Sequence, residues 1–183
     1  EYIAAGSGDG KVYLFDKDSN TPLWNYTTGS TVYSVAISAD GEYIAAGSWD
    51  DKVYLFDKDS STPLWNYTAG EGVRSVTISA DGKYIAAASY DDYVYLFDKD
   101  SSTPLWSYTA GSTVSDVAIS ADGEYITAGS VDNKVYLFDK DSSTPLWSYS
   151  TGSDVESVSI SSDGEYITAG SQSDGSNTRK VYL

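Results

Sequence analysis

The sequence contains no cysteine, no histidine and no methionine among its 183 residues. Without cysteine the chain can form neither a disulfide framework nor a cysteine metal site. Without histidine it lacks the commonest general base of nucleophilic triads. No glycine-rich loop precedes a helical pattern, so a phosphate cradle is not supported either. We therefore expect that the protein is not an enzyme.

Basic residues are also scarce: 11 Lys and Arg stand against 27 Asp and Glu, for a net charge of −16. Such an acidic surface repels nucleic-acid phosphates and anionic lipid headgroups, so we expect neither as a partner. No run of 18 or more apolar residues occurs, so we expect no membrane insertion. Hydrophobic residues nevertheless make up 40% of the chain, which is enough for a packed core.

One pattern of 41 residues fills the sequence. Near-copies occupy residues 1–41, 42–82, 83–123 and 124–164, and a partial copy occupies residues 165–183. Repeats of 20 to 50 residues are typical of solenoids, propellers and other repeat arrays. We therefore treat residues 1–183 as a single repeat-built region.

Each copy predicts four short strands, which we name b, c, d and a in chain order. In the second copy they fall at residues 42–48 (EYIAAGS), 52–57 (KVYLFD), 64–68 (LWNYT) and 73–79 (VRSVTIS). Asp-Gly and Asp/Ser/Pro clusters between them indicate tight turns. No helical periodicity appears, and one such sheet cannot bury both of its faces. Stacked sheets can, so we expect an all-β protein, a β-propeller of four-stranded antiparallel blades.

The order of the strands places the boundaries of the blades. Complete blades span residues 30–69, 71–110 and 112–151, with a partial blade at each end and about 4.5 repeats in all. We expect an incomplete or open ring with exposed sheet edges. Such a chain is a segment of a longer propeller, or it completes its blades with neighbouring molecules. Copies of itself are possible partners, in an oligomer or filament.

Two families resemble this repeat. The stretch VAISADGEYIAAGSWDDKVYLFD (35–57) resembles a WD-repeat blade, with Phe-Asp where that blade ends its third strand in Trp-Asp. The stretch VYLFDKDSSTPLWSYTAG (94–111) resembles the PQQ-type propeller repeat, which carries a tryptophan on its outer strand. The equivalent tryptophans are Trp24, Trp65, Trp106 and Trp147, which we expect to pack between blades.

The resemblance covers the whole chain and implies a propeller fold, but this sequence departs from the pattern of both families. The WD-repeat histidine is absent, and so is the cysteine pair of PQQ enzymes. It therefore implies no catalytic residue. The near-identical copies and acidic charge favour a secreted or cell-surface protein of a prokaryote, with an archaeon preferred over a bacterium.

The copies differ mainly at one end of the predicted blades. The a–b and c–d turns meet at one end and hardly vary, whereas the b–c and d–a turns meet at the other and vary most. Loops on a rigid scaffold are where recognition usually lies. Exposed aromatic residues beside carboxylates suit a glycan or a protein partner. The candidate binding residues are Tyr33, Trp49, Asp50, Asp51, Arg74, Tyr90, Asp91, Asp92 and Tyr93. Unselected loop variation is the alternative.

Two further motifs recur. Asp-Lys-Asp-Ser begins each c–d loop and resembles the opening of a Ca²⁺ loop, but the closing Gly and Glu are absent, so an Asx-type turn is favoured. We expect no cofactor, with Ca²⁺ as the lesser alternative. Asn25 and Asn66 lie in N-glycosylation sequons on strand d. Their presence also favours an extracellular location.

These observations support three functional hypotheses. The first is a non-catalytic repeat scaffold of an extracellular or cell-surface protein with a structural, adhesive or assembly role. The second is a module that recognises a glycan or protein through the variable loops. The third, least favoured, is the propeller domain of an enzyme.

Overall fold

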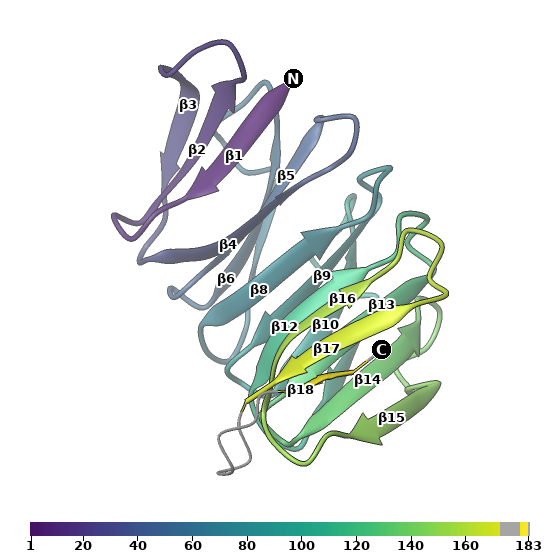
Figure 1. Cartoon of the computed structure of the whole chain (residues 1–183). Helices are drawn as coiled ribbons and strands as arrows, with labels where there is room; N and C mark the ends of the chain where they lie inside the picture. Colours follow the sequence, from purple (N-terminus) through teal and green to yellow (C-terminus); the bar gives the residue numbers. More distant parts are fainter. Residues whose placement is uncertain (173–179, 183) are drawn as a thin grey trace.

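The computed structural model describes residues 1–172 and 180–182. This part of the chain forms eighteen β-strands and no helix. The described residues therefore contain no helix that is long and apolar enough to cross a membrane. The strands make five antiparallel sheets that follow one another along the chain (Figure 1). The all-β prediction is confirmed.

The strands recur in the predicted order. Strand a is β4 (Val32–Ile37), β8 (Val73–Ile78), β12 (Val114–Ile119) and β16 (Val155–Ile160). Strand b is β1 (Tyr2–Gly6), β5 (Tyr43–Ser48), β9 (Tyr84–Ser89), β13 (Tyr125–Ser130) and β17 (Ile167–Ser171). Strand c is β2 (Lys11–Asp16), β6 (Lys52–Asp57), β10 (Tyr93–Asp98), β14 (Lys134–Asp139) and β18 (Lys180–Tyr182). Strand d is β3 (Pro22–Thr27), β7 (Trp65–Thr68), β11 (Trp106–Thr109) and β15 (Trp147–Ser150).

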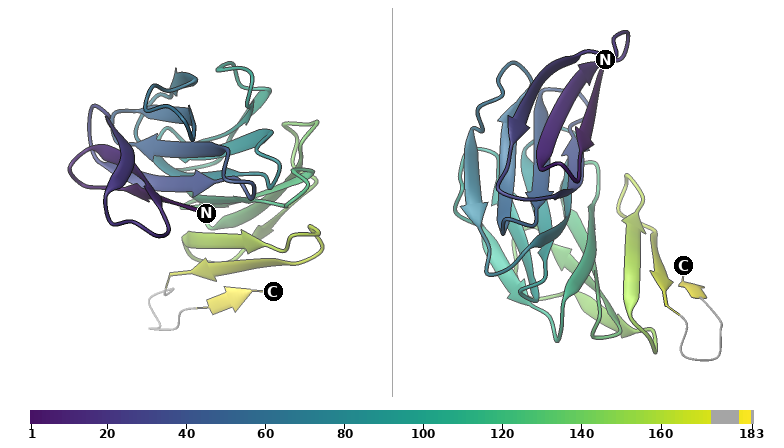
Figure 2. Two further views of the ribbon diagram at one scale, coloured as in Figure 1. Left: turned by 90° about the horizontal axis from the view of Figure 1, so that it is seen from above. Right: turned by 90° about the vertical axis from the view of Figure 1, so that its left-hand side faces the viewer.

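The sheets stack face to face as the blades of an open propeller. Three sheets have all four strands in the order a-b-c-d, and they lie within residues 30–69, 71–110 and 112–151. Sheet β1–β3 has no strand a, and the described part of the last sheet is β16–β18. The a strands contact one another from sheet to sheet and line the inside. Figure 2 shows the first and last sheets unjoined, so the ring is open, as predicted.

The core lies between neighbouring sheets. Strand c is apolar on both faces because it has a sheet on each side, and Val53, Tyr54, Leu55 and Phe56 are all buried. Small residues of strand b allow the close approach of the next sheet. A side chain at Gly47 would lie only 2.7 Å from Val73 of the next strand a. Close packing across these junctions holds the stack together.

The strand-d tryptophans dock each sheet onto the next. The Trp65 indole N–H donates to the carbonyl of Lys99 at 2.7 Å, and its ring lies 5.3 Å from the Phe97 ring. Trp24 makes the same pair of contacts with Lys58 and Phe56, and Trp106 with Lys140 and Phe138. The predicted blade-to-blade packing of these three tryptophans is confirmed.

Candidate functional site

The b–c turns, where the variable loops begin, are built around one carboxylate. In the second copy, Asp50 accepts hydrogen bonds from the backbone N–H of Lys52 at 3.2 Å and of Gly29 at 2.6 Å, and from the Tyr54 hydroxyl at 2.6 Å. Because Gly29 lies in the loop that follows β3 of the preceding sheet, this carboxylate also ties neighbouring sheets together. Burial, reinforced by the bond to Asp50, raises the pKa of the Tyr54 hydroxyl well above its usual range.

The next two copies repeat this arrangement. Asp91 accepts from the Tyr95 hydroxyl at 2.7 Å and from the Gly70 N–H at 2.6 Å, and Asp132 accepts from the Tyr136 hydroxyl and the Gly111 N–H. The lone pairs of Asp50 and Asp91 are therefore engaged inside the protein. Although both residues are candidates on sequence grounds, their main contacts in the structure hold the turn and the sheet junction.

Asp51 and Asp92 follow these carboxylates in the turn. Both have a left-handed backbone, with φ of 69° and 72°, which Asp and Asn tolerate better than most residues. Gly10 and Asn133 hold the same conformation in other copies. Turn geometry thus accounts for the residue type at this position, while the two side chains remain half-exposed beside the variable rim.

The variable residue of each strand a sits at a β-bulge. Pairing with strand b shifts register between Val32 and Ser34, and the same shift recurs in β8, β12 and β16. The bulged residues are Tyr33, Arg74, Ser115 and Glu156. A bulge leaves its extra residue out of the ladder and re-aims the side chain. This explains how four unrelated residue types fit one position of the repeat.

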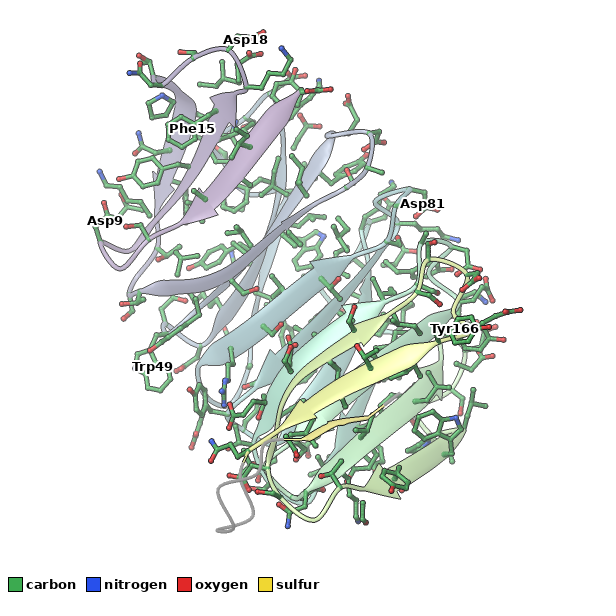
Figure 3. The ribbon with its side chains drawn as sticks, viewed as in Figure 1. Asp9, Phe15, Asp18, Trp49, Asp81 and Tyr166 are labelled. Carbon is green, nitrogen blue, oxygen red and sulfur yellow. The ribbon has the colours of Figure 1, made fainter. Side chains whose placement is uncertain are left out.

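Three aromatic residues meet on this rim, and we call them the aromatic patch: Tyr33, Trp49 and Tyr90. The Trp49 ring lies 5.4 Å from the Tyr33 ring and 4.8 Å from the Tyr90 ring, the latter edge-on. Tyr33 is 52% exposed and Trp49 46% exposed, so the patch is packed yet open to solvent. Figure 3 shows Trp49 projecting from the end of the sheets where Asp9 lies, away from the turns of Asp18 and Asp81.

A polar arm continues the patch across the next sheets. It consists of Arg74, Ser115, Glu156 and Gln172. The Arg74 guanidinium lies 5.8 Å from the centre of the Tyr90 ring and pairs with Glu156 at 2.6 Å. Arg74 also donates to the Ser115 hydroxyl at 3.4 Å, and the Gln172 amide donates to Glu156 at 2.6 Å. The patch and the arm form one continuous line of variable residues, as the antiparallel topology predicts.

Tyr93 lies apart from this line. Its ring stacks on Tyr95 at 5.6 Å and packs against the core between the first and second complete sheets, as Trp65 and Tyr67 also do. Of the nine candidate residues, the structure therefore brings Tyr33, Trp49, Arg74 and Tyr90 into direct contact. The others serve the b–c turns or the sheet junction.

Gly72 is an unpredicted part of the site. A side chain added at Gly72 would lie 2.7 Å from the Trp49 ring, so the indole rests on this glycine. The equivalent residues are Thr31, Thr113 and Asp154. Gly72 and Trp49 belong to the same copy of the repeat, so the sequence does pair this glycine with this tryptophan. The pairing can be interpreted only once the two turns are known to touch.

Asp116 is another unpredicted contact, located on strand a. Its carboxylate accepts from the Ser75 hydroxyl at 2.7 Å and from the Ser157 hydroxyl at 3.1 Å, and so bridges three sheets. It also accepts from the Val158 N–H at 3.0 Å. The equivalent residues of the other copies are serines, so this carboxylate bridge is a local feature of β12.

The Asp-Lys-Asp-Ser loops form Asx-type turns. Asp57 accepts the backbone N–H of Asp59 at 2.8 Å, and Lys58 pairs with Asp59 at 2.7 Å. The first, third and fourth copies repeat both contacts. Within residues 1–172 and 180–182, no group of three or more acidic side chains is arranged to hold a metal ion.

The two candidate glycosylation sites are accessible. Asn25 lies on β3 and Asn66 on β7, both on outer strands and both exposed. A glycan at either position would project from the outside of the stack, away from the core. Their placement is compatible with modification and is separate from the aromatic patch.

Family comparisons agree with this geometry. A model of the family described as outer membrane protein assembly factor BamB, a PQQ-type repeat family, matches residues 50–179. A model of the WD domain, G-beta repeat, matches residues 20–57. A search of curated proteins found no match. Both repeat families are propeller scaffolds for protein interaction or assembly. Because the match to the BamB model covers more than half of the chain, the protein belongs to the BamB-like family of PQQ-type propeller repeats.

Proposed function

We propose that this chain is a non-catalytic scaffold of an extracellular or cell-surface protein, which acts by assembling with other proteins, copies of itself included. In this proposal the aromatic patch is its contact surface for a protein partner. The family supports the general role, because its repeats are interaction and assembly modules. The location is supported by the exposed sequons at Asn25 and Asn66 and by the net charge of −16.

The observation that carries the proposal is the exposure of a preassembled aromatic cluster. Trp49 and Tyr33 keep about half of their surfaces in water although each already contacts another ring. Tyrosine, tryptophan and arginine are the residues most often found at binding hot spots. Because the rings support one another and Trp49 rests on Gly72, little side-chain freedom remains to be lost on binding.

A protein partner fits the patch better than a glycan does. Sugar recognition combines an aromatic platform with free hydrogen-bonding groups for the hydroxyls. Here two carboxylates of the adjoining b–c turns, Asp50 and Asp91, are engaged by backbone and tyrosine donors. Glu156 and Arg74 are likewise paired with each other. The exposed rings, together with the half-exposed carboxylates of Asp51 and Asp92 beside the rim, keep glycan binding as the second candidate function.

A photo-crosslinking experiment tests this proposal. A benzophenone amino acid is placed at position 49, and in a control protein at position 100, which is exposed on a c–d loop at the opposite end of the sheets. Illumination in cells that produce the protein should give protein adducts at position 49 and none of the same mass at position 100. A Tyr33→Ser exchange should weaken the position-49 adduct.

The opposite results are equally clear. Equal labelling from both positions, or no protein adduct at position 49, would refute the patch as a protein-binding surface. A glycan array probed with the unmodified chain and with Trp49→Ala decides between the two partner classes. Binding that disappears in Trp49→Ala would favour the glycan.

A further inference from the structure

The rim around the aromatic patch holds carboxylates that nothing in the described part of the chain engages. They are Asp51, Glu71 and Asp92, and we call them the rim carboxylates. Glu71 is exposed and the other two are half-exposed. Within residues 1–172 and 180–182, none of these three side chains forms a hydrogen bond or an ion pair. They lie in turns of the complete sheets β4–β7 and β8–β11, as Trp49 does.

Two rim carboxylates occur together with the aromatic residues of the patch. Where a b–c turn begins with an aromatic residue, its third residue is aspartate, and where it begins with glycine or valine, its third residue is glycine or asparagine. The four pairs are Gly8 and Gly10, Trp49 and Asp51, Tyr90 and Asp92, and Val131 and Asn133. Glycine and asparagine also adopt the left-handed backbone of this position. The turn therefore does not require the negative charge.

Two further exchanges make the same rim more negative. Glu71 stands where the other full copies have a serine, and Tyr93 stands where they have a lysine. The equivalent residues are Ser30, Ser112 and Ser153 for the first position and Lys11, Lys52 and Lys134 for the second. Glu71 directly precedes Gly72, on which the Trp49 ring rests. The copies that form the patch therefore gather negative charge at positions that are neutral or basic elsewhere.

Arg74 adds a positive charge to this rim, but that charge is already paired. Its guanidinium lies 2.6 Å from the Glu156 carboxylate and 5.8 Å from the centre of the Tyr90 ring. The chain thus supplies its own guanidinium at the Tyr90 end of the patch. Among the described residues, no lysine or arginine lies over the ring of Trp49 or Tyr33. The Trp49 end is therefore the open position for a second cation.

An aromatic ring among unpaired carboxylates matches the chemistry of a guanidinium. A cation is attracted to the face of an aromatic ring, and tryptophan attracts it most strongly. Arginine also stacks on rings and offers its planar fork of N–H donors to carboxylates. An ionised carboxylate only accepts hydrogen bonds and a guanidinium only donates them, so the two are complementary.

We propose that the protein partner inserts an arginine side chain of a basic segment between the Trp49 ring and the rim carboxylates. This inference rests on the proposed role of the aromatic patch in protein binding and names the chemistry of the partner. The guanidinium covers the open part of Trp49, which is 46% exposed. The net charge of −16 attracts a basic segment from a distance, and the rim determines where it docks.

A short labelled peptide serves as the probe. Fluorescein-labelled Gly-Arg-Gly-Arg-Gly is titrated with the unmodified chain and binding is followed by fluorescence polarisation. The matched peptide replaces both arginines with citrulline, which keeps the shape of the side chain and removes its charge. The arginine peptide should bind saturably, and the citrulline peptide at least about 10-fold more weakly. Binding of the arginine peptide should also weaken as salt rises from about 0.05 M to about 0.5 M.

A variant without the rim carboxylates tests where the peptide binds. It carries Asp51→Asn, Glu71→Ser and Asp92→Asn, residues that the chain itself has at equivalent positions, so the turns should be kept. Binding of the arginine peptide should weaken about 10-fold, since an ion pair and a cation-binding site are lost. Trp49→Val should weaken it about 5-fold, because the ring is lost while the charges remain. Urea denaturation verifies that each variant is folded.

The matched control removes the same charge from the opposite end of the sheets. It carries Asp18→Asn, Asp59→Asn and Asp100→Asn on the c–d loops, where these exposed side chains pair with the preceding lysines. Figure 3 shows Asp18 far from Trp49. Both triple variants change the net charge by the same three units. The control should bind the arginine peptide within about 2-fold of the unmodified chain, because long-range attraction is screened by salt.

Several outcomes would overturn the inference. They are an arginine peptide that does not bind, a citrulline peptide that binds equally well, or equal weakening in the rim variant and its control. Failure here is distinguishable from failure of the proposed function. A position-49 crosslink to protein that persists undiminished in the rim variant would leave the patch as a protein-binding surface and refute the arginine contact. Absence of any position-49 adduct would refute the proposed function itself.

Discussion

The junctions between sheets and the rim above them are made by the same 41-residue repeat, but they use aromatic residues in opposite ways. In the junctions, tryptophan and phenylalanine recur at fixed positions in the four full copies, as Trp65 and Phe97 do, and Phe97 is fully buried. On the rim, Trp49 and Tyr90 occur at a position that is Gly8 or Val131 in other copies, and Trp49 is about half exposed. Uniform residues therefore hold the stack together, and residues peculiar to one copy stand exposed on the rim, where our proposal places the contact with a partner.

The largest expected effect is in a junction. Trp106→Ala removes the ring that packs on Phe138 and the indole N–H that satisfies the Lys140 carbonyl. We expect a loss of about 3 to 5 kcal/mol in the free energy of unfolding, measured by urea denaturation. Trp49→Ala is the matched control and should lose less than half as much. Equal losses of unfolding free energy in the two variants would contradict the distinction between junction and rim.

The next effect is at the carboxylate that joins the two regions. Asp91→Ala removes the acceptor of the Tyr95 hydroxyl and of the Gly70 N–H, and Tyr95 is 5% exposed. Since a buried hydroxyl would lose its partner, we expect a loss of about 2 to 3 kcal/mol in the same measurement. The neighbouring exchange Asp92→Asn keeps a residue that tolerates the left-handed turn and should change stability little. A smaller loss for Asp91→Ala than for Asp92→Asn would contradict these roles.

Acid should weaken the invariant turns. The Ser120 hydroxyl and the Glu124 N–H donate to Asp122 and hold the pKa of its carboxyl below the usual range. Because this pKa is lower in the folded state, the contribution is complete above the unfolded value of about 4 and is lost as pH falls through the folded value. Ser120→Ala should reduce this loss between about pH 4 and pH 2. Ser142→Ala, whose hydroxyl lies near the Thr144 backbone, should not alter the pH profile.

The smallest effect is expected on the polar arm. Arg74→Ala breaks the ion pair with Glu156, whose partners are 28% and 34% exposed. Ion pairs open to solvent contribute about 1 kcal/mol or less, so the unfolding midpoint should hardly move. Binding of the partner identified by crosslinking should weaken more than stability does. A stability loss comparable with that of Trp106→Ala would place the arm in the structural framework.

The sequence predicts the framework well because the framework repeats. Asp-Gly turns, the unbroken apolar run of strand c and the recurrent outer tryptophan are local signals that appear four or five times over. They were sufficient to predict the strands, the open ring and the end of the blades at which Tyr33, Trp49 and Arg74 meet. Even the bulge has a local signal, since Val32 and Val35 break the two-residue alternation expected of a strand.

The contacts within the site are less accessible from sequence because they join residues of different copies. Gly72 matters because it lies under Trp49, and Asp116 because it reaches Ser75 and Ser157. Asp50 looked like a binding carboxylate beside an aromatic residue, yet its hydrogen bonds to Gly29 and Tyr54 belong to the framework. Composition and spacing do not distinguish a carboxylate that faces a partner from one that faces the next sheet.

One unfolding measurement tests the central claim most directly. The triple variant Tyr33→Ser, Trp49→Val and Tyr90→Val replaces the aromatic patch with residues that the chain itself carries at equivalent positions, Ser115 and Val131. If the patch serves recognition, the triple variant should lose less unfolding free energy than Trp106→Ala loses alone, below about 3 kcal/mol. A larger loss would show that the patch is part of the core and would contradict the separation of framework and recognition surface.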